Sequence, residues 1–163
     1  MARLLGAEPE EIVFTSGGTE SNNLAIKGIC LRDNFSGGGG HIVTSVIEHP
    51  ATLMPIRFLE RMGVEVSLCP CDRNGLISPD DVEKLLRDAT RLVTVMHANN
   101  ETGVIQPISE IASRCREREI PFHTDSAQTI GKVDATAETL GVDLISIAAH
   151  KFYAPKGLSL IHI

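Results

Sequence analysis

The sequence predicts an α/β domain, with a three-layer arrangement in which helices cover both faces of a mainly parallel sheet. Short β-branched runs alternate with amphipathic stretches along the chain, and this alternation is typical of parallel strands joined by helical crossovers. The 163 residues match a single domain, which at this length buries roughly 70% of its unfolded surface. Hydrophobic residues at 42% with only 4% aromatics indicate a core of aliphatic side chains.

Six runs rich in β-branched and aliphatic residues predict strands. In chain order they are Glu11–Thr15, His41–Val46, Val64–Pro70, Arg91–His97, Pro121–Thr124 and Asp143–Ala148. Apolar residues at helical spacing predict four helices between them. These are Glu20–Leu31, Ala51–Met62, Pro79–Arg87 and Pro107–Arg118. The helix at Pro79 has the clearest start, because Ser78 stands at the N-cap and acids follow in the first turn.

The remaining segments are a linker and the two ends of the sequence. Asn34–Gly40 contains four consecutive glycines and predicts a surface connection, since the glycines do not lead into a helix. Met1 falls in the last turns of a helix closed by Gly6, and Ile163 ends an apolar, strand-like run. We therefore expect residues 1–163 to be part of a larger domain.

Charge and hydropathy exclude two classes of partner. The net charge is −6, and arginines alternate with glutamates in Arg114–Glu119, which indicates a solvated helix face and no nucleic-acid surface. No stretch approaches the roughly 18 consecutive apolar residues of a membrane span, and Met1–Gly6 lacks a signal-peptide core. We expect a cytoplasmic protein that binds neither nucleic acid nor membrane.

The four cysteines predict buried, reduced thiols. Cys30, Cys69, Cys71 and Cys115 show no C-x-x-C spacing, and no metal site is predicted. A redox or persulfide-carrying role for one of them has no local motif to support it.

A glycine-containing turn opens the first long helix. It reads Thr15-Ser16-Gly17-Gly18-Thr19-Glu20-Ser21-Asn22-Asn23 and follows the first predicted strand. Gly17 and Gly18 let the backbone approach a ligand, and free N–H groups with the Thr19 hydroxyl form an anion site suited to a phosphate. The spacing is neither G-x-G-x-x-G nor a P-loop, and a capped turn explains the same residues equally well.

Two more polar motifs follow strands, at the carboxyl ends where α/β sheets bind ligands. In Glu48-His49-Pro50, the His49 imidazole suits stacking on a flat cofactor or proton transfer. In His97–Gly103, amide and carboxylate groups are suited to polar ring substituents. A structural histidine and simple turn chemistry remain open alternatives.

The last two motifs pair an acid with a lysine. Asp125, within His123–Gln128, ends one predicted strand, and Lys151 follows another directly after His150. A lysine amine forms a Schiff base with the aldehyde of pyridoxal phosphate, and a carboxylate keeps its pyridine nitrogen protonated so that the ring is an electron sink. Gln128 lies about one helical turn from Asp125, within reach of a phenolic oxygen. An N-cap role for Asp125 and a surface role for Lys151 are the alternatives.

Together the motifs resemble the class V aminotransferase group of fold-type I pyridoxal phosphate enzymes, specifically its NifS-like cysteine desulfurases and selenocysteine lyases. They are, in order, Thr15–Asn23, Glu48-His49, Asn99–Gly103, His123–Gln128 and His150-Lys151. The resemblance implies that the chain is a partial large domain that binds pyridoxal 5'-phosphate, without the small C-terminal domain.

The resemblance also implies roles for single residues. Lys151 is the Schiff-base lysine, with His49 as the second catalytic residue because it stacks on the cofactor ring. Asp125 is implied to partner the pyridine nitrogen. The remaining implied cofactor-binding residues are Gly18, Thr19, Asn100, Gln128 and His150, with Thr19 and His150 at the phosphate and Asn100 and Gln128 at the ring hydroxyl.

The implied activity converts cysteine to alanine and leaves persulfide sulfur on the enzyme, as in sulfur metabolism and iron–sulfur cluster assembly. A selenocysteine lyase, or another class V lyase or transaminase, is the alternative within the group, since the motifs present bind cofactor. The resemblance further implies a homodimer in the full-length form and a sulfur-acceptor protein. A non-catalytic fragment or interaction module is the alternative of a different class.

The chain departs from the family pattern at three points. Ala148 stands where the family has Ser or Thr two residues before the phosphate-binding histidine, which removes one expected phosphate contact. The loop with the nucleophilic cysteine and the arginine for the substrate carboxylate have no counterpart, so we expect this chain not to be fully active alone. The tail Gly157–Ile163 also drifts from the strand expected next.

Overall fold

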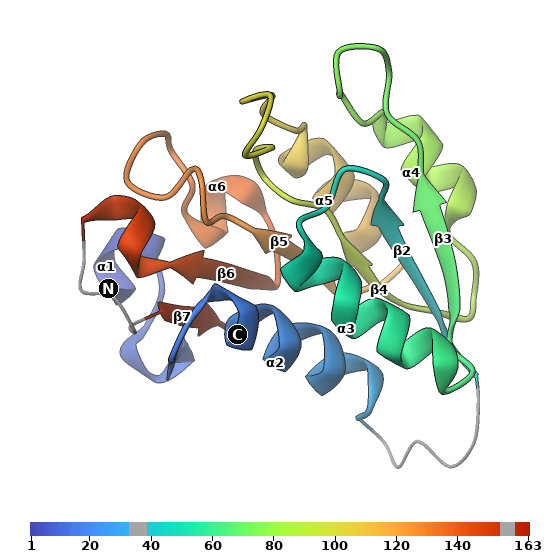
Figure 1. Cartoon of the computed structure of the whole chain (residues 1–163), viewed down its shortest axis with the longest axis horizontal. Coiled ribbons are helices and arrows are strands. Elements are labelled where there is room, and N and C mark those ends of the chain that lie inside the picture. The colour runs from blue at the N-terminus through green and yellow to red at the C-terminus, as the bar shows by residue number, and fades with distance from the viewer. Residues whose placement is uncertain (33–38, 154–158) are drawn as a thin grey trace.

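A computed structural model of the chain describes residues 1–32, 39–153 and 159–163. Seven strands form one sheet in the order β1-β7-β6-β5-β4-β2-β3 (Figure 1). They are β1 (Ile12–Thr15), β2 (His41–Ser45), β3 (Glu65–Cys69), β4 (Thr90–Thr94), β5 (Phe122–Asp125), β6 (Leu144–Ala148) and β7 (Ser159–His162). The five strands from β2 to β6 pair in parallel, whereas β7 runs antiparallel to both β1 and β6. The prediction of a mainly parallel sheet is therefore confirmed.

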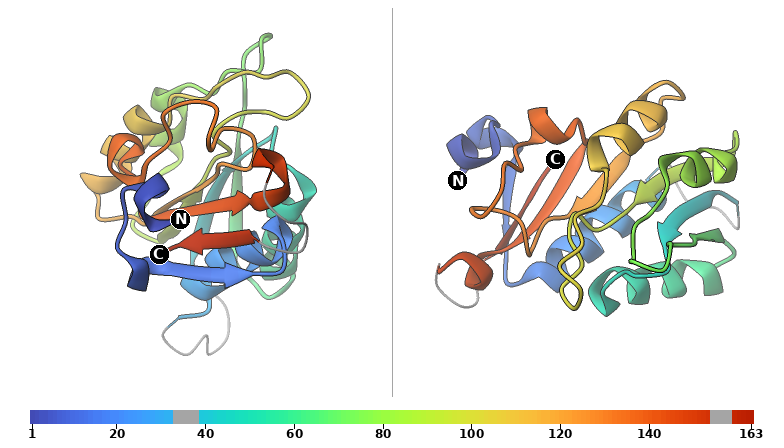
Figure 2. Two further views of the ribbon diagram at one scale, coloured as in Figure 1. Left: turned by 90° about the vertical axis from the view of Figure 1, so that its left-hand side faces the viewer. Right: turned by 90° about the horizontal axis from the view of Figure 1, so that it is seen from above.

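Helices cover both faces of the sheet, as Figures 1 and 2 show. They are α1 (Ala2–Leu5), α2 (Gly18–Cys30), α3 (Pro50–Arg61), α4 (Pro79–Leu85), α5 (Ile108–Arg116) and α6 (Ala137–Leu140), with 3-10 turns η1 (Pro9–Glu11) and η2 (Ala149–Phe152). Helices α2 and α3 lie together in front of the sheet in Figure 1, and α4 and α5 lie behind it. This is the predicted three-layer arrangement.

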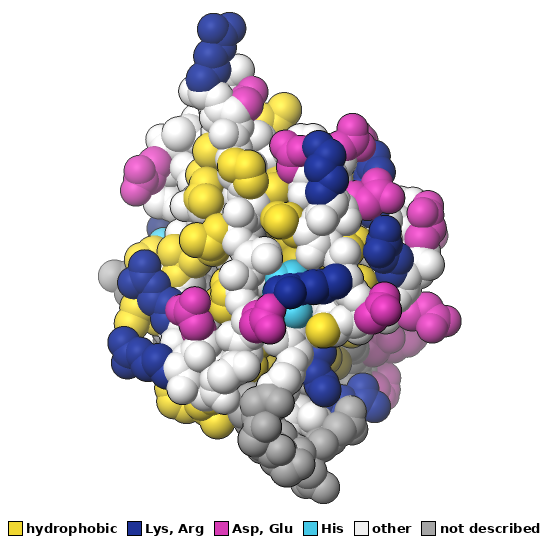
Figure 3. Space-filling model, turned by 90° about the vertical axis from the view of Figure 1, so that its right-hand side faces the viewer, with side chains coloured by type: hydrophobic (Ala, Val, Ile, Leu, Met, Phe, Trp, Pro, Cys, Tyr) yellow, Lys and Arg dark blue, Asp and Glu magenta, His cyan; other side chains and the backbone are white. Residues whose placement is uncertain are grey.

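Buried side chains alternate between the two faces along the central strands. Ile42 and Leu92 pack with residues of α2 and α3, whereas their neighbours Val43 and Val93 pack in the larger cluster with α4 and α5. The period of two along a strand explains why both residues of each pair are apolar, since parallel strands are buried on both faces. On β3, at one end of the sheet, Leu68 is exposed, and Figure 3 shows apolar side chains gathered on this side of the molecule.

Two buried histidines tie neighbouring strands together across the sheet. His123 on β5 is hydrogen-bonded through Nδ1 to Thr94 Oγ1 at 2.7 Å and through Nε2 to Ser146 Oγ at 2.9 Å. Complete burial lowers the pKa of His123 to about 3, so the ring is neutral at physiological pH. His41 on β2 makes the corresponding pair of bonds to Thr90 and Ser67. The His123 bonds link β5 to β4 and β6, and the His41 bonds link β2 to β4 and β3.

The predicted strands and helices are all present, with shifted ends. The largest shift is in Arg91–His97, where the strand begins at Thr90 and ends at Thr94, the last residue that pairs with β2. Helix α4 begins at Pro79 as predicted, but the Ser78 side chain does not cap it. Gly6 closes α1 in the left-handed conformation, with φ of 65°. Among the described residues, no helix is both long and apolar enough to cross a bilayer.

The tail confirms the strand-like run that was expected to end at Ile163, despite its departure from the family pattern. Residues 159–162 do not drift from the sheet but form β7, inserted between β1 and β6. Leu160 and Ile161 are buried on opposite faces, which explains their apolar character. The predicted linker Asn34–Gly40 falls mostly outside the described residues.

Candidate functional site

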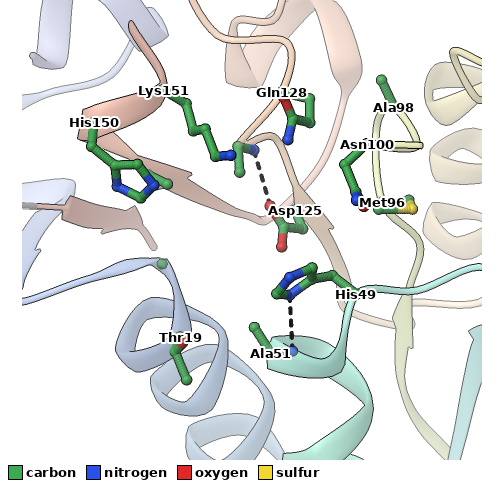
Figure 4. A pocket seen from close by; sticks show the side chains of 13 residues that line it. Thr19, His49, Ala51, Met96, Ala98, Asn100, Asp125, Gln128, His150 and Lys151 are labelled. Atoms are coloured by element: carbon green, nitrogen blue, oxygen red, sulfur yellow. Dashed lines mark hydrogen bonds between the residues drawn. The ribbon is translucent and has the colours of Figure 1, made fainter. Parts of the chain in front are cut away.

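A cavity of about 330 Å³ lies at the carboxyl ends of the central strands, beside the N-termini of α2 and α3. Its volume is at the lower end of the roughly 300–1,000 Å³ of small-molecule sites. All eight residues predicted from the sequence line it, and Figure 4 shows the side chains of His49, Gln128 and Lys151 meeting from separate elements. They are Gly18, Thr19, His49, Asn100, Asp125, Gln128, His150 and Lys151. Ala51, Met96, Ala98, Ala127 and Ala148 complete the wall.

Asp125 is the buried acid of this cavity. Its Oδ2 accepts a hydrogen bond from Asn22 Nδ2 at 2.7 Å, and its Oδ1 accepts one from the Ala127 N–H at 2.9 Å. Burial raises the pKa of the Asp125 carboxyl, while these two hydrogen bonds and the nearby His49 act to lower it. The bond to Ala127 is the local turn role that the sequence left open, and the carboxylate fulfils it while still lining the cavity.

Asn22 is a site residue that sequence reasoning did not identify. It is fully buried in α2 and donates to both Asp125 and Thr52 Oγ1, so it links β5 to helices α2 and α3. Its Oδ1 has no hydrogen-bond partner among the described residues. The available signal was its position, because Asn22 lies four residues after Gly18 and therefore on the same helix face as the cavity lining.

His49 is oriented by the start of α3. It is the N-cap of that helix, and its Nδ1 accepts a hydrogen bond from the Ala51 N–H at 3.0 Å. With Nδ1 acting as acceptor, the neutral ring carries its proton on Nε2. The imidazole is exposed and lies at the cavity opposite Lys151 and Gln128 in Figure 4. Capping and cavity lining are thus combined in one side chain.

The two asparagines after β4 divide the roles that the sequence left undecided. Asn99 provides the turn: its Oδ1 accepts from the Glu101 and Thr102 N–H groups, and its Nδ2 donates to the Ile47 carbonyl. Asn100 is exposed and lines the cavity. The adjacent turn residue therefore holds Asn100 in place.

Lys151 and His150 belong to the 3-10 turn η2 that directly follows β6. Both side chains are exposed, and the Lys151 chain extends into the cavity toward Asp125 in Figure 4. Gln128 faces the same space from hydrogen-bonded turns after β5. The helical spacing expected between Asp125 and Gln128 is wrong, because no helix forms there; tight turns bring Gln128 to the cavity.

The N-terminus of α2 forms another part of the wall. Its N-cap is Gly17, which has no side chain to bond the first N–H groups of the helix. A Cβ atom at Gly18 would come within 3.3 Å of the Ala148 Cβ, so glycine allows α2 to approach the end of β6. The helix dipole and these N–H groups favour an anion at this position.

Known proteins are similar to this chain along its whole length. Residues 1–163 match the aminotransferase class-V family. The chain belongs to this family. Cysteine desulfurase IscS of Dictyoglomus turgidum is 51% identical over all of this chain and 41% of its own length, and that of Vibrio vulnificus is 52% identical over 40% of its length. The chain thus spans about two fifths of these class-V relatives.

Solved structures of similar proteins share the fold. SspA in complex with cysteine superposes with a TM-score of 0.93 at 45% identity, over 99% of this chain and 46% of SspA. A NifS-like protein superposes with a TM-score of 0.92 at 39% identity, over 99% of this chain and 44% of its own. The predicted family and its fold are therefore confirmed, and proteins of this family depend on pyridoxal phosphate.

Ala148 is the position where this class-V chain lacks an expected hydroxyl. Ser146, two residues earlier on β6, does not replace it, because its hydroxyl is buried and bonded to His123. We predict that Ala148→Ser tightens pyridoxal phosphate binding about threefold to tenfold, since one hydrogen bond contributes about 1 kcal/mol. Equilibrium titration measures the change. Pyridoxal, which lacks the phosphate, should bind the wild type and Ala148→Ser with equal affinity. If the substitution tightens pyridoxal binding as much as pyridoxal phosphate binding, residue 148 does not contact the phosphate.

Proposed function

We propose that this chain is the pyridoxal phosphate-binding portion of a cysteine desulfurase. The observation that carries the proposal is the convergence of five separate sequence motifs on one cavity, with a buried acid and a lysine chain reaching toward it. The family match and the cysteine desulfurase relatives support it. The cysteine bound in the SspA structure supports cysteine as the substrate.

The residues present fit this cofactor in charge and chemistry. The uncapped N-terminus of α2, with Thr19 and His150 beside it, suits the phosphate. Asp125 suits a protonated pyridine nitrogen, because its two protein hydrogen bonds favour the ionised carboxylate. Gln128 and Asn100 suit the ring hydroxyl. Pyridoxal phosphate, when bound, supplies a ring that withdraws electrons from the substrate's α-carbon.

The chain's own groups then have distinct tasks. The Lys151 amine binds the cofactor and is placed to take up or return a proton at its Nζ. Asp125 provides a buried negative charge. His49 covers one face of the cofactor ring and excludes water from that face. Asn22 maintains the direction of the Asp125 carboxylate through its Nδ2–H.

The four cysteines of the chain are poorly suited to accept sulfur. Burial raises the thiol pKa of Cys30 and Cys115 to about 12 and that of Cys69 to about 11, so these groups remain protonated at neutral pH. Cys71 is half-buried, and none of the four lines the cavity. The nucleophile of the proposed reaction is therefore supplied from outside these residues.

The proposal extends to partners and place. We propose that the full-length form is a homodimer, that it passes sulfur to an acceptor protein, and that it is located in the cytoplasm. Free thiols at all four cysteines and the net charge of −6 are consistent with it. Selenocysteine is the alternative substrate.

The test is a titration of the purified chain with pyridoxal phosphate and, as a control, with pyridoxal. We expect saturable one-to-one binding of pyridoxal phosphate and much weaker binding of pyridoxal, because the helix N-terminus binds the phosphate. Absence of saturable binding contradicts the proposal. Supplying cysteine to the loaded chain should yield little alanine and sulfide, and rapid release of both would make Cys71 the suspected nucleophile.

A further inference from the structure

Glu48 is a buried acid next to the cavity whose role the proposed function leaves open. Only 6% of its surface is exposed, and it lies in the short connection between β2 and α3. Its Oε1 accepts two hydrogen bonds, from Ser45 Oγ at 2.5 Å and from the Met96 N–H at 2.8 Å. Ser45 ends β2 and Met96 follows β4, so one carboxyl oxygen joins the ends of two neighbouring strands.

The backbone that Glu48 holds continues directly to the cavity on both sides. Met96 lines the cavity, and the next N–H, that of His97, donates to the Asp125 carbonyl at 3.0 Å. On the other side, the next residue in sequence is His49, whose ring also lines the cavity. The Glu48 carboxyl therefore anchors the segments that carry two of the cavity walls.

The surroundings of Glu48 favour the protonated acid. Its Oε2 is buried and has no hydrogen-bond partner among the described residues, which is costly for a carboxylate. Burial raises the pKa of Glu48 to about 8, the bonds from Ser45 and Met96 lower it, and the negative charge of Asp125 adds to the rise. The charge of Asp125 thus acts together with burial to favour the protonated form of Glu48.

We infer that Glu48 is a positioning residue, held as a neutral carboxylic acid, which clamps the ends of β2 and β4 and thereby fixes His49 and Met96 around the cofactor cavity. The negative charge of Asp125 favours this neutral state. Asp125 on β5 is the ionisable group whose charge acts on Glu48, and two histidines stand next in sequence to the joined residues: His49 after Glu48, and His97 after Met96, where burial lowers the pKa of His97. The effect on cofactor binding rests on the proposed function.

The neutral state is tested first, on the protein without cofactor. Infrared difference spectroscopy at about pH 6 to 7, below the raised pKa of Glu48, should show the carbonyl stretch of a protonated carboxylic acid. The band should disappear in Glu48→Gln and persist in the exposed control Glu110→Gln. A band unchanged in Glu48→Gln, or absent from the wild type, overturns the inference without bearing on pyridoxal phosphate binding.

The positioning role is tested by pyridoxal phosphate affinity from about pH 6 to about pH 9. Glutamine keeps an oxygen acceptor for Ser45 and Met96 and cannot ionise, so Glu48→Gln should bind within about threefold of wild type at pH 6. Above about pH 8 Glu48 ionises beside Asp125, and the wild type should weaken relative to Glu48→Gln by at least about threefold. Glu48→Ala leaves the buried Met96 N–H unpaired and should weaken binding roughly tenfold at every pH.

Circular dichroism and thermal melting establish that each variant is folded before its affinity is compared. If Glu48→Ala unfolds, Glu48→Gln still decides the question through its pH profile. If the ratio of the pyridoxal phosphate affinities of the wild type and Glu48→Gln does not change with pH, the inference is overturned. A wild type that binds no cofactor at any pH refutes the proposed function instead.

Discussion

Lys151→Ala is expected to abolish the lysine-dependent absorption band of bound pyridoxal phosphate. The Lys151 amine is the primary amine that lines the cavity, and its side chain extends toward Asp125. Alanine removes the nucleophile and leaves the phosphate and ring contacts in place, so weak, non-covalent binding should persist. Absorption spectroscopy during a cofactor titration measures the loss.

The matched control is Lys132→Ala, which removes an exposed lysine that does not line the cavity. Its spectrum should equal that of the wild type. The free energy of unfolding of each variant should lie within about 0.5 kcal/mol of the wild-type value, because each removes a solvent-exposed side chain. A band that survives in Lys151→Ala but is lost in Lys132→Ala would show that the wrong lysine was assigned.

Asp125→Asn should weaken pyridoxal phosphate binding by roughly tenfold to a hundredfold. A hydrogen bond to a charged group contributes about 1.5–3 kcal/mol, and asparagine removes the charge that pairs with a protonated pyridine nitrogen. Geometry should survive the change. Asn22 Oδ1 has no partner among the described residues, so a flip of the Asn22 amide lets it accept from the new side chain.

The same substitution should stabilise the protein without cofactor at neutral pH. The pKa of Asp125 is raised by burial, so the folded state binds its proton more tightly than the unfolded chain. Stability contributed by this group is therefore greatest at low pH and decreases as pH rises above the unfolded value of about 3.9. Asparagine cannot ionise and avoids this loss.

Chemical denaturation at about pH 4 and about pH 7 measures the effect. The free energy of unfolding of Asp125→Asn, relative to wild type, should increase between the two values. The exposed control Asp88→Asn should show no such increase. A decrease for Asp125→Asn at neutral pH would mean that the ionised carboxylate is a net stabilising group.

Most of the fold follows from local pattern. The strands His41–Ser45 and Leu144–Ala148 are buried along their whole length, and strands buried on both faces indicate a parallel sheet with helices on each side. The position of β7 could not be predicted this way. Its antiparallel pairing with β1 joins the two ends of the sequence, and no local signal specifies so distant a partner.

The cavity lining was predictable because each motif follows a strand or begins a helix. The residues behind the lining were not. Asn22 and Glu48 lie within recognised motifs, yet their partners, Asp125 and the Met96 N–H, are far away in the sequence. Hydrogen-bond partners of buried polar groups depend on which strands are neighbours, and this information is absent from any single segment.

The sequence by itself determined the main strands and helices, the α/β class, the family and eight of the residues that line the cavity, because these depend on periodicity and on short motifs. The tertiary structure alone decided that Asn99 makes the turn while Asn100 faces the cavity, that Ser146 is bonded to His123, and that Glu48 stands beside Asp125. Burial and the charge of neighbouring groups arise only when distant strands pack together. These two effects set the protonation of both acids.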